Sequence, residues 1–186
     1  MSSMLLVAPA AEPLSLVEAK QFLRVDHDDD DALIAALIAA ARRLVETATR
    51  RALITQTWRI VRDAWPAGGR IRVLPAPLRT LVAARIHDAD GMPRPIPVGA
   101  FALDTAAAPG VIAAAPGTLP APGLRVAGIA LDVTVGYGAA ADVPAPLVQA
   151  VRLWLAHFYE ARGVDAAAGP PPAVAALIAS YRVLAP

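Results

Sequence analysis

One apolar stripe, between Leu33 and Ala48, constrains the fold of this chain more than any other feature. Apolar residues recur there every three or four positions, which is the period of one face of an α-helix. Arg42, Arg43 and Arg50 lie largely off the stripe. Full burial of its six large side chains would contribute roughly 1.5–3 kcal/mol each. We therefore predict that burial of this stripe in a core holds a long helix in place.

Four aspartates, Asp28–Asp31, stand at the predicted start of this helix. Free N–H groups and the helix dipole favour carboxylates there, by roughly 0.3–1 kcal/mol each. The spacing from Asp26 to Asp30 also matches the first three ligand positions of an EF-hand calcium loop. That match fails later, because Asp31 replaces the glycine and Leu37 replaces the glutamate. We interpret the aspartates as a helix start, with a weak cation site or an electrostatic contact as the alternative.

Three shorter helices are expected beside the long one. Ser15 and Glu18 have the spacing of a capping box, which begins a first helix of about residues 15–25. Pro146 suits a first helical turn, Gly163 is a candidate C-cap, and residues 165–172 form a linker before the last helix. The expected apolar faces consist of Leu16, Ala19, Phe22 and Leu23, of Leu147, Val151, Trp154, Leu155 and Phe158, and of Val174, Leu177, Ile178, Tyr181 and Leu184.

The segment between Thr55 and Tyr137 has a different character. Twelve of the eighteen prolines fall between Pro66 and Pro146, and they confine their surroundings to loops, edges and extended connections. The runs "RIRVL" and "IALDVTVGY" alternate with a period of two, which is typical of half-buried strands. "DADG", at residues 88–91, reads as a turn. These patterns predict a small antiparallel sheet or barrel-like insert with long loops.

The predicted fold class is therefore α+β, with a helical core of about four helices and an inserted antiparallel β-rich subdomain. We assign residues 1–54 to the N-terminal helices of the core, 55–138 to the insert, and 139–186 to the C-terminal helices and tail of the same core. The longest apolar run, Ala32–Ala41, is well short of the roughly 20 residues that span a bilayer. The first residues lack a basic region, so we expect no signal peptide and no membrane contact.

The sequence offers little chemistry for catalysis. There is no cysteine, which excludes disulfides, thiolate metal sites and cysteine nucleophiles. His157 beside Glu160 is either an acid–base pair or a histidine packed near Trp154 and Phe158. The three histidines have no metal-ligand spacing, and no phosphate-binding glycine loop is present. We expect no cofactor and no enzymatic activity; a small metal-dependent hydrolase using Asp26, Asp28 or His157 is the remaining alternative of this class.

The charged ends of the long helix are candidate contact surfaces. The net charge of +1 is too balanced for a protein held on nucleic acid by charge alone. A helix with one acidic and one basic end suits head-to-tail contacts between identical subunits, because such interfaces pair unlike surfaces. A plain solvated face and a DNA-phosphate contact are the alternatives. The candidate inter-subunit or partner contacts are Asp28, Asp29, Asp30, Arg42, Arg43, Arg50 and Arg51.

Three segments together resemble the head–tail connector, or adaptor, proteins of long-tailed bacteriophages. The first is "LSLVEAKQFLRVDHDDDDALIAALIAAARRLVETATRRALITQTW", the second "VTVGYGAAADVPAPLVQAVRLWLAHFYEARG", and the third "AVAALIASYRVLAP". Their order and spacing agree with that family, so the resemblance covers nearly the whole chain and is least distinctive in the sheet region.

The resemblance implies a structural ring, typically of twelve copies, beneath the portal in the neck of a phage or a phage-like particle such as a gene transfer agent. Such a ring extends the channel through which double-stranded DNA passes without sequence-specific binding, and it docks a stopper or tail-terminator protein. It would be assembled in the bacterial cytoplasm. Another neck protein, a stopper or tail-completion factor, is the alternative. The implied portal contact consists of Ser180, Tyr181, Arg182, Val183, Leu184, Ala185 and Pro186.

Overall fold

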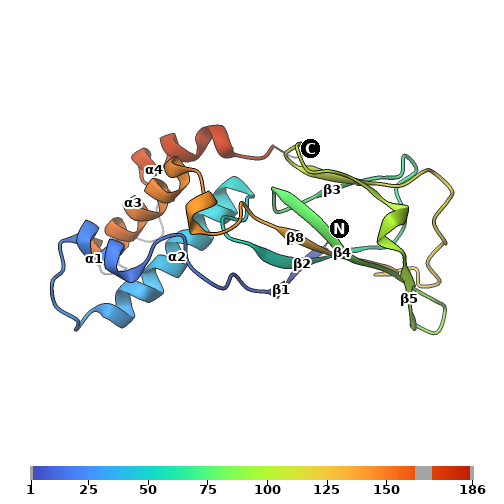
Figure 1. Ribbon diagram of the computed structural model, residues 1–186, viewed down its shortest axis with the longest axis horizontal. Coiled ribbons are helices and arrows are strands. Elements are labelled where there is room, and N and C mark those ends of the chain that lie inside the picture. The colour runs from blue at the N-terminus through green and yellow to red at the C-terminus, as the bar shows by residue number, and fades with distance from the viewer. Residues whose placement is uncertain (1, 162–168, 185–186) are drawn as a thin grey trace. The chain divides into compact units, whose positions relative to one another are not determined.

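The computed structural model describes residues 2–161 and 169–184 and confirms the α+β class. The chain divides into two compact units, which we name the sheet unit (residues 2–9 and 55–136) and the helical unit (residues 10–54 and 137–184). The chain thus enters the sheet unit first, leaves it for the first half of the helical unit, and returns to it before completing the helices (Figure 1). The predicted C-cap Gly163 and residues 165–168 of the predicted linker lie outside the described residues.

The helical unit contains the four predicted helices. They are α1 (Leu16–Leu23), α2 (Asp31–Thr49), α3 (Ala145–Ala161) and α4 (Pro172–Ile178), with short 3₁₀ turns at Ala140–Asp142 and Ala179–Tyr181. α3 packs against both α2 and α4. Their shared core is built from buried apolar residues, among them Ile34, Ile38, Ala41 and Val45 of α2, Leu147, Val151 and Leu155 of α3, and Val174 and Ile178 of α4.

The predicted capping box is present at the start of α1, which spans Leu16–Leu23 where the sequence predicted a helix of about residues 15–25. The Ser15 hydroxyl accepts a hydrogen bond from the Glu18 N–H (3.3 Å), and the Glu18 carboxylate accepts one from the Ser15 N–H (3.0 Å), which completes the predicted capping box. These bonds from Ser15 lower the pKa of the Glu18 carboxyl. α1 and α2 stop at Arg24 and Arg50, both in the left-handed conformation (φ 59° and 56°).

Four residues of the helical unit differ from the predicted pattern. Leu33, Phe22 and Leu184, which we placed on apolar stripes, are 50%, 39% and 85% exposed, and Leu184 lies beyond α4 and the 3₁₀ turn that follows it. The buried line of α2 runs through Ile34 and every third or fourth residue after it, so Leu33 lies about 100° to one side. Arg42, predicted to lie off the stripe, is buried, and the reason is a pair of carboxylates described below.

The sheet unit consists of two antiparallel sheets. The larger has the strand order β1-β2-β8-β4-β5 and the smaller the order β3-β7-β6. The strands are β1 (Ser2–Val7), β2 (Gln56–Arg62), β3 (Arg70–Val73), β4 (Leu78–His87), β5 (Pro93–Ile96), β6 (Ala102–Asp104), β7 (Gly110–Ala113) and β8 (Ile129–Val135), with a 3₁₀ turn, η1 (Val98–Ala100), after β5. The predicted turn at residues 88–91 joins β4 to β5, and Gly91 supplies its positive φ of 78°. The sequence patterns predicted no helix or strand for residues 2–7, which form β1.

The central strand β8 is not half-buried as we predicted, because both of its faces are covered. Its alternate face carries Asp132, whose carboxylate accepts hydrogen bonds from Arg59 Nε (2.7 Å) and Nη2 (2.9 Å) on β2 and a short one from Arg85 on β4. Arg59 and Asp132 are direct partners across the two strands. The Arg59 hydrogen bond, and then the charge of Arg85, lower the pKa of Asp132. Two guanidinium groups therefore allow a carboxylate to be buried at the centre of the sheet.

Within the described ranges, no helix combines the length and the apolar character that a membrane crossing requires.

Candidate functional site

The acidic cluster at the start of α2 is partly used to hold the helical unit together. Lys20 Nζ on α1 lies 2.5 Å from Asp28 Oδ1 and 2.7 Å from Asp31 Oδ1. The hydrogen bond from Lys20 lowers the pKa of Asp28, and the same contact raises the pKa of Lys20. Tyr159 Oη on α3 donates to Asp30 Oδ2 at 2.6 Å. Asp29 points outward, with 96% of its side chain exposed. The cluster therefore joins α1, α2 and α3 and leaves an acidic surface outside.

This geometry favours the helix-start interpretation over a cation site. Among the residues that the structure describes, no group of three or more His, Asp or Glu side chains is placed to hold a metal ion. Asp30 is the N-cap residue of α2, and Asp31 lies in its first turn. The Asp30 side chain makes no capping hydrogen bond, so the carboxylates favour the helix start through their charge near its N-terminus.

Arg42, one of the candidate contacts, lies inside its own unit. Its Nε lies 2.7 Å from Glu12 and its Nη1 2.6 Å from Glu46 of the same helix. Glu46 also accepts the N–H of Leu53 at 2.8 Å. The Arg42 guanidinium thus connects the segment before α1 to α2. The Glu46 carboxylate connects α2 to the segment that follows it.

The basic end of α2 has two kinds of arginine. Arg43 and Arg50 are exposed, and the backbone N–H of Arg50 closes the helix on the carbonyl of Glu46. Arg51 is half-buried, and its Nε donates to the carbonyl of Tyr181 at 2.6 Å. α2 therefore presents exposed carboxylates at one end and exposed guanidinium groups at the other.

The predicted portal-contact segment, residues 180–186, contacts the C-terminal end of α2 through its described residues. The N–H of Val183 donates to the carbonyl of Thr49 at 2.9 Å, and the Val183 side chain is buried. With the Arg51–Tyr181 bond, this fixes the segment at two points. Ser180 and Arg182 face outward, and Leu184 is 85% exposed. Ala185 and Pro186 of the predicted contact lie outside the described residues.

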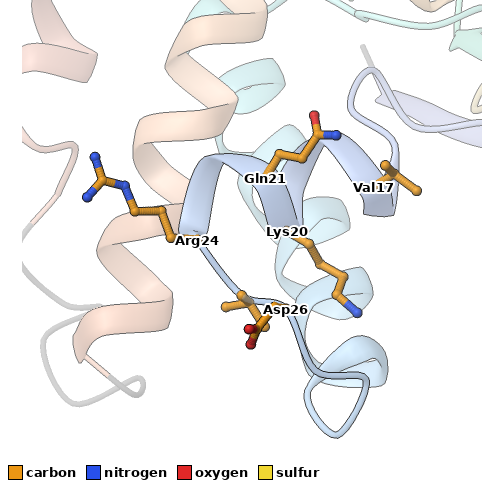
Figure 2. Close-up of a pocket in the computed structure, with 6 residues that line it drawn as sticks. Val17, Lys20, Gln21, Arg24 and Asp26 are labelled. Atoms are coloured by element: carbon orange, nitrogen blue, oxygen red, sulfur yellow. The ribbon is translucent and has the colours of Figure 1, made fainter.

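Two surface hollows are candidate ligand sites. The first, beside α1, is lined by Val17, Lys20, Gln21, Arg24, Val25 and Asp26. Figure 2 shows that the labelled side chains diverge from α1 and the loop after it instead of converging on one point. The second, in the sheet unit, has mostly apolar walls that include Trp65 and Phe101, and the Trp65 indole N–H donates to the Pro120 carbonyl. Neither hollow gathers the convergent polar groups of a small-molecule site.

His157, the other candidate for chemistry, is placed among aromatic rings. It lies on α3 with its ring centroid 6.0 Å from that of Phe158, and Phe158 stacks in turn on Trp154 at 6.5 Å. This arrangement fits a packed histidine better than half of an acid–base pair with Glu160.

The comparisons with known proteins agree with the resemblance described above. Residues 13–80 match the family model described as phage gp6-like head-tail connector protein. A chain in a structure described as the virion of a native gene transfer agent (GTA) particle is 30% identical, with a TM-score of 0.85, and the match covers 100% of this chain and 97% of that one. No curated protein matches. The chain therefore belongs to the head-tail connector family.

Two further structures match over the same shares of each chain. One is described as the neck of a native GTA particle computed with C12 symmetry (30% identity, TM-score 0.80). The other is described as the neck of an empty GTA particle computed with C6 symmetry (29% identity, TM-score 0.84). Both units of this chain are thus shared with these relatives.

Proposed function

We propose that this chain acts as the adaptor ring of a phage-like particle: twelve copies assemble beneath the portal, extend the DNA channel and dock a stopper or tail-terminator protein. The family of this chain and its neck relatives indicate a structural role in the head–tail neck. The observation that carries the proposal is the match over 100% of this chain and 97% of a gene transfer agent chain at 30% identity. A full-length match means that neither unit is an unrelated addition.

The C-terminal segment is the proposed portal contact. Its anchoring on Thr49 and Arg51 holds it in one conformation, and this limits the ordering cost of binding. Arg182 and Leu184 are the side chains it offers, one charged and one apolar. Val183 is buried, so its role in the proposed contact is to hold the segment rather than to touch the portal.

The ends of α2 are the proposed charged contacts between neighbouring copies. Asp28 and Asp29 at one end and Arg43 and Arg50 at the other are exposed and opposite in sign. In a ring, each subunit meets its neighbour through two different surfaces, so opposite charges on one subunit can pair from copy to copy. Asp28 remains exposed although it also binds Lys20 of its own subunit. The other candidates, Asp30, Arg42 and Arg51, are partly or fully buried against partners in their own subunit and would support these ends indirectly.

The proposed work of the protein is binding and not catalysis. Many modest contacts repeated around a ring give a stable joint without any single strong one. DNA must slide through the channel, so the lining should not grip phosphates strongly, and the net charge of +1 is compatible with that demand.

In vitro complementation tests this function. Particles produced without this chain should accumulate as heads and tails that do not join, and the purified protein should restore joined particles. Joined particles that form equally well without the chain would contradict a neck role. Binding of the chain to tail components but not to portal-bearing heads would instead favour a stopper or tail-completion factor.

A further inference from the structure

The larger sheet has a basic face, which we name the Asp132 face. Its strands contain five arginines and a single carboxylate, that of Asp132. Arg59 lies directly opposite Asp132, and Arg85 lies two positions after Ala83, the partner of Asp132 on β4, so all three charged side chains are on one side of the sheet. The other side carries buried apolar residues, which include Ile60, Ala84, Leu131 and Val133.

Two guanidinium groups share this one carboxylate, so the cluster keeps a net charge of +1. The side chains of Arg59 and Arg85 are 28% and 25% exposed, so a ligand can reach them. Each guanidinium has five N–H donors, and only three bonds join the pair to Asp132. Among the described residues, Arg59 Nη1 and Arg85 Nε and Nη1 find no acceptor. The cluster is therefore a cation whose remaining donors are available to an anion.

A row of threonines lies next to this cluster. Thr57, Thr134 and Thr80 are in register across β2, β8 and β4, and Thr134 lies two positions after Asp132 on the same face. Thr80 is exposed, and Thr57 and Thr134 are half-buried. Threonine hydroxyls are neutral donors that commonly contact phosphate oxygens. An anion on this face thus meets guanidinium groups and hydroxyls, and the one carboxylate there is already paired.

We propose that the Asp132 face binds the phosphate backbone of double-stranded DNA and is the surface that each copy presents to the channel. This inference rests on the proposed function, and it names the surface that the DNA meets. Guanidinium groups bind phosphate oxygens through paired N–H groups. Asp132 holds both arginines in place before the DNA arrives, which lowers the ordering cost of the contact.

The shared carboxylate also sets the strength of this contact. Asp132 cancels one of the two positive charges, so each copy offers a net charge of +1 to the DNA. A weak contact repeated around a ring suits a polyanion that presents phosphates at every step and has to slide past. An acidic side chain of a partner protein is the competing ligand, and the tests below separate the two.

Arg85→Gln is the most selective change at this face. It removes the excess positive charge and leaves Arg59 bound to Asp132 through two hydrogen bonds. Arg125→Gln is the matched control, because Arg125 is exposed in the segment before β8 and forms no ion pair with a described residue. Both full-length variants would be assembled on the portal, after circular dichroism and thermal unfolding establish that they are folded. Fluorescence anisotropy with a labelled duplex DNA, at several salt concentrations, then measures the affinity.

The slope of log affinity against log salt concentration gives the number of phosphate contacts. Arg85→Gln should reduce this slope by about 0.9 or more, which is one phosphate contact, and Arg125→Gln should leave it unchanged. Equal slopes for Arg85→Gln and wild type would overturn the inference. An equal loss in both variants would also overturn it, because net charge alone would then explain the binding.

Assembly separates DNA from a protein partner. A folded Arg85→Gln variant that forms few rings, while its DNA affinity is unchanged, would overturn the inference in favour of a contact with an acidic protein surface. Wild-type protein that forms no ring on the portal would contradict the proposed function itself. Wild-type rings that form normally while Arg85→Gln binds DNA as wild type does would overturn only the DNA-binding face.

Photo-cross-linking tests the geometry, because the chain has no cysteine of its own. Thr80→Cys lies on the Asp132 face, and Thr105→Cys, also at an exposed position, lies just after β6 of the smaller sheet. Each would be labelled with the same photoactivatable thiol reagent and irradiated in the portal–ring complex with duplex DNA. Cross-links to DNA should form from position 80 and not from position 105. DNA cross-links from position 105 alone, or from neither position, would contradict the proposal.

Discussion

Tyr159 of α3 donates a 2.6 Å hydrogen bond to the carboxylate of Asp30, the N-cap residue of α2, although 129 positions separate them in the chain. This bond joins the two halves of the helical unit, which the sheet-unit segment interrupts. It also fixes the position of the acidic cluster, so the exposed aspartates beside it are presented on a defined surface.

Removal of this hydrogen bond should destabilise the helical unit. Tyr159→Phe keeps the ring and deletes only the hydroxyl, and a bond to a charged acceptor contributes about 1.5–3 kcal/mol to the free energy of unfolding. Urea unfolding followed by circular dichroism measures the change. Glu160→Gln, at the exposed neighbouring position, is the control and should change stability by no more than about 0.5 kcal/mol. Equal stability of Tyr159→Phe and wild type would show that the bond contributes nothing.

Arg42 and Arg43 should differ sharply in their effect on stability. Arg42→Ala leaves the carboxylates of Glu12 and Glu46 without their shared cation, and loss of one partner of a buried ion pair costs about 3–5 kcal/mol. Arg43→Ala removes an exposed charge and should cost no more than about 0.5 kcal/mol. The midpoint of chemical denaturation measures both. Similar midpoints for the two variants would contradict the role assigned to Arg42.

Asp132 should make the sheet unit sensitive to acid. Its pKa is lowered in the folded state, chiefly by the Arg59 hydrogen bond, so its ionised form stabilises the fold above the ordinary carboxyl pKa of about 4. This stabilisation should be lost as the pH falls below that value and through the lowered pKa. Thermal unfolding between pH 7 and pH 3 measures the effect. Glu18, Asp28 and Asp88 have lowered pKa values of the same sign, so the comparison with Asp132→Asn isolates the share of Asp132.

Asp132→Asn should lower stability at pH 7, because two guanidinium groups then lose their carboxylate, and it should flatten the fall in melting temperature on acidification. An unchanged pH dependence in this variant would mean that the carboxylates at the surface carry the effect.

Charge reversal at the exposed basic end of α2 should impair assembly and leave the monomer intact. Arg43→Glu with Arg50→Glu replaces two outward guanidinium groups that have no described ion pair. If they contact the acidic end of a neighbour, ring formation on the portal should fall steeply and recover when Asp29, whose side chain is 96% exposed and does not bind Lys20, is changed to lysine. Analytical ultracentrifugation measures the assembly. Undiminished ring formation by this variant would show that both arginines lie on a solvated face and make no contact between subunits.

Leu184 should contribute to portal binding and not to folding. Leu184→Asp alters a side chain that is 85% exposed, so the melting temperature should stay within about 1–2 °C while binding to the portal weakens. Removal of residues 180–186 should abolish binding altogether. Biosensor measurements on immobilised portal rings give both affinities. Val17→Asp, at an exposed position on α1, is the control; equal affinity of Leu184→Asp and wild type would refute the contact.

Local patterns in the sequence were sufficient to predict the helices and several sheet features. The capping box of Ser15 and Glu18 and the alternation of Ile71 and Val73 depend on neighbours a few positions away, and both are present in the structure. The core line of α2 follows from its 3.6-residue period in the same way, although the period alone placed Leu33 on the wrong side of the boundary.

Local sequence patterns could not predict features that depend on residues far away in the chain. β1 pairs with residues fifty or more positions later, and its own sequence carries no alternation that would identify it as a strand. The burial of Arg42 depends on Glu12, which lies 30 positions earlier. The two arginines that allow Asp132 to be buried come from different strands. In each case the deciding contact exists only in the folded chain.

The most direct test of the central claim is native mass spectrometry of this protein mixed with the portal protein encoded in the same gene cluster. The adaptor function predicts a complex in which a portal ring carries a closed set of copies of this chain, with twelve as the expected number. If both proteins are folded and the portal is a ring, but no complex forms or single copies bind without closing a ring, the adaptor function is contradicted.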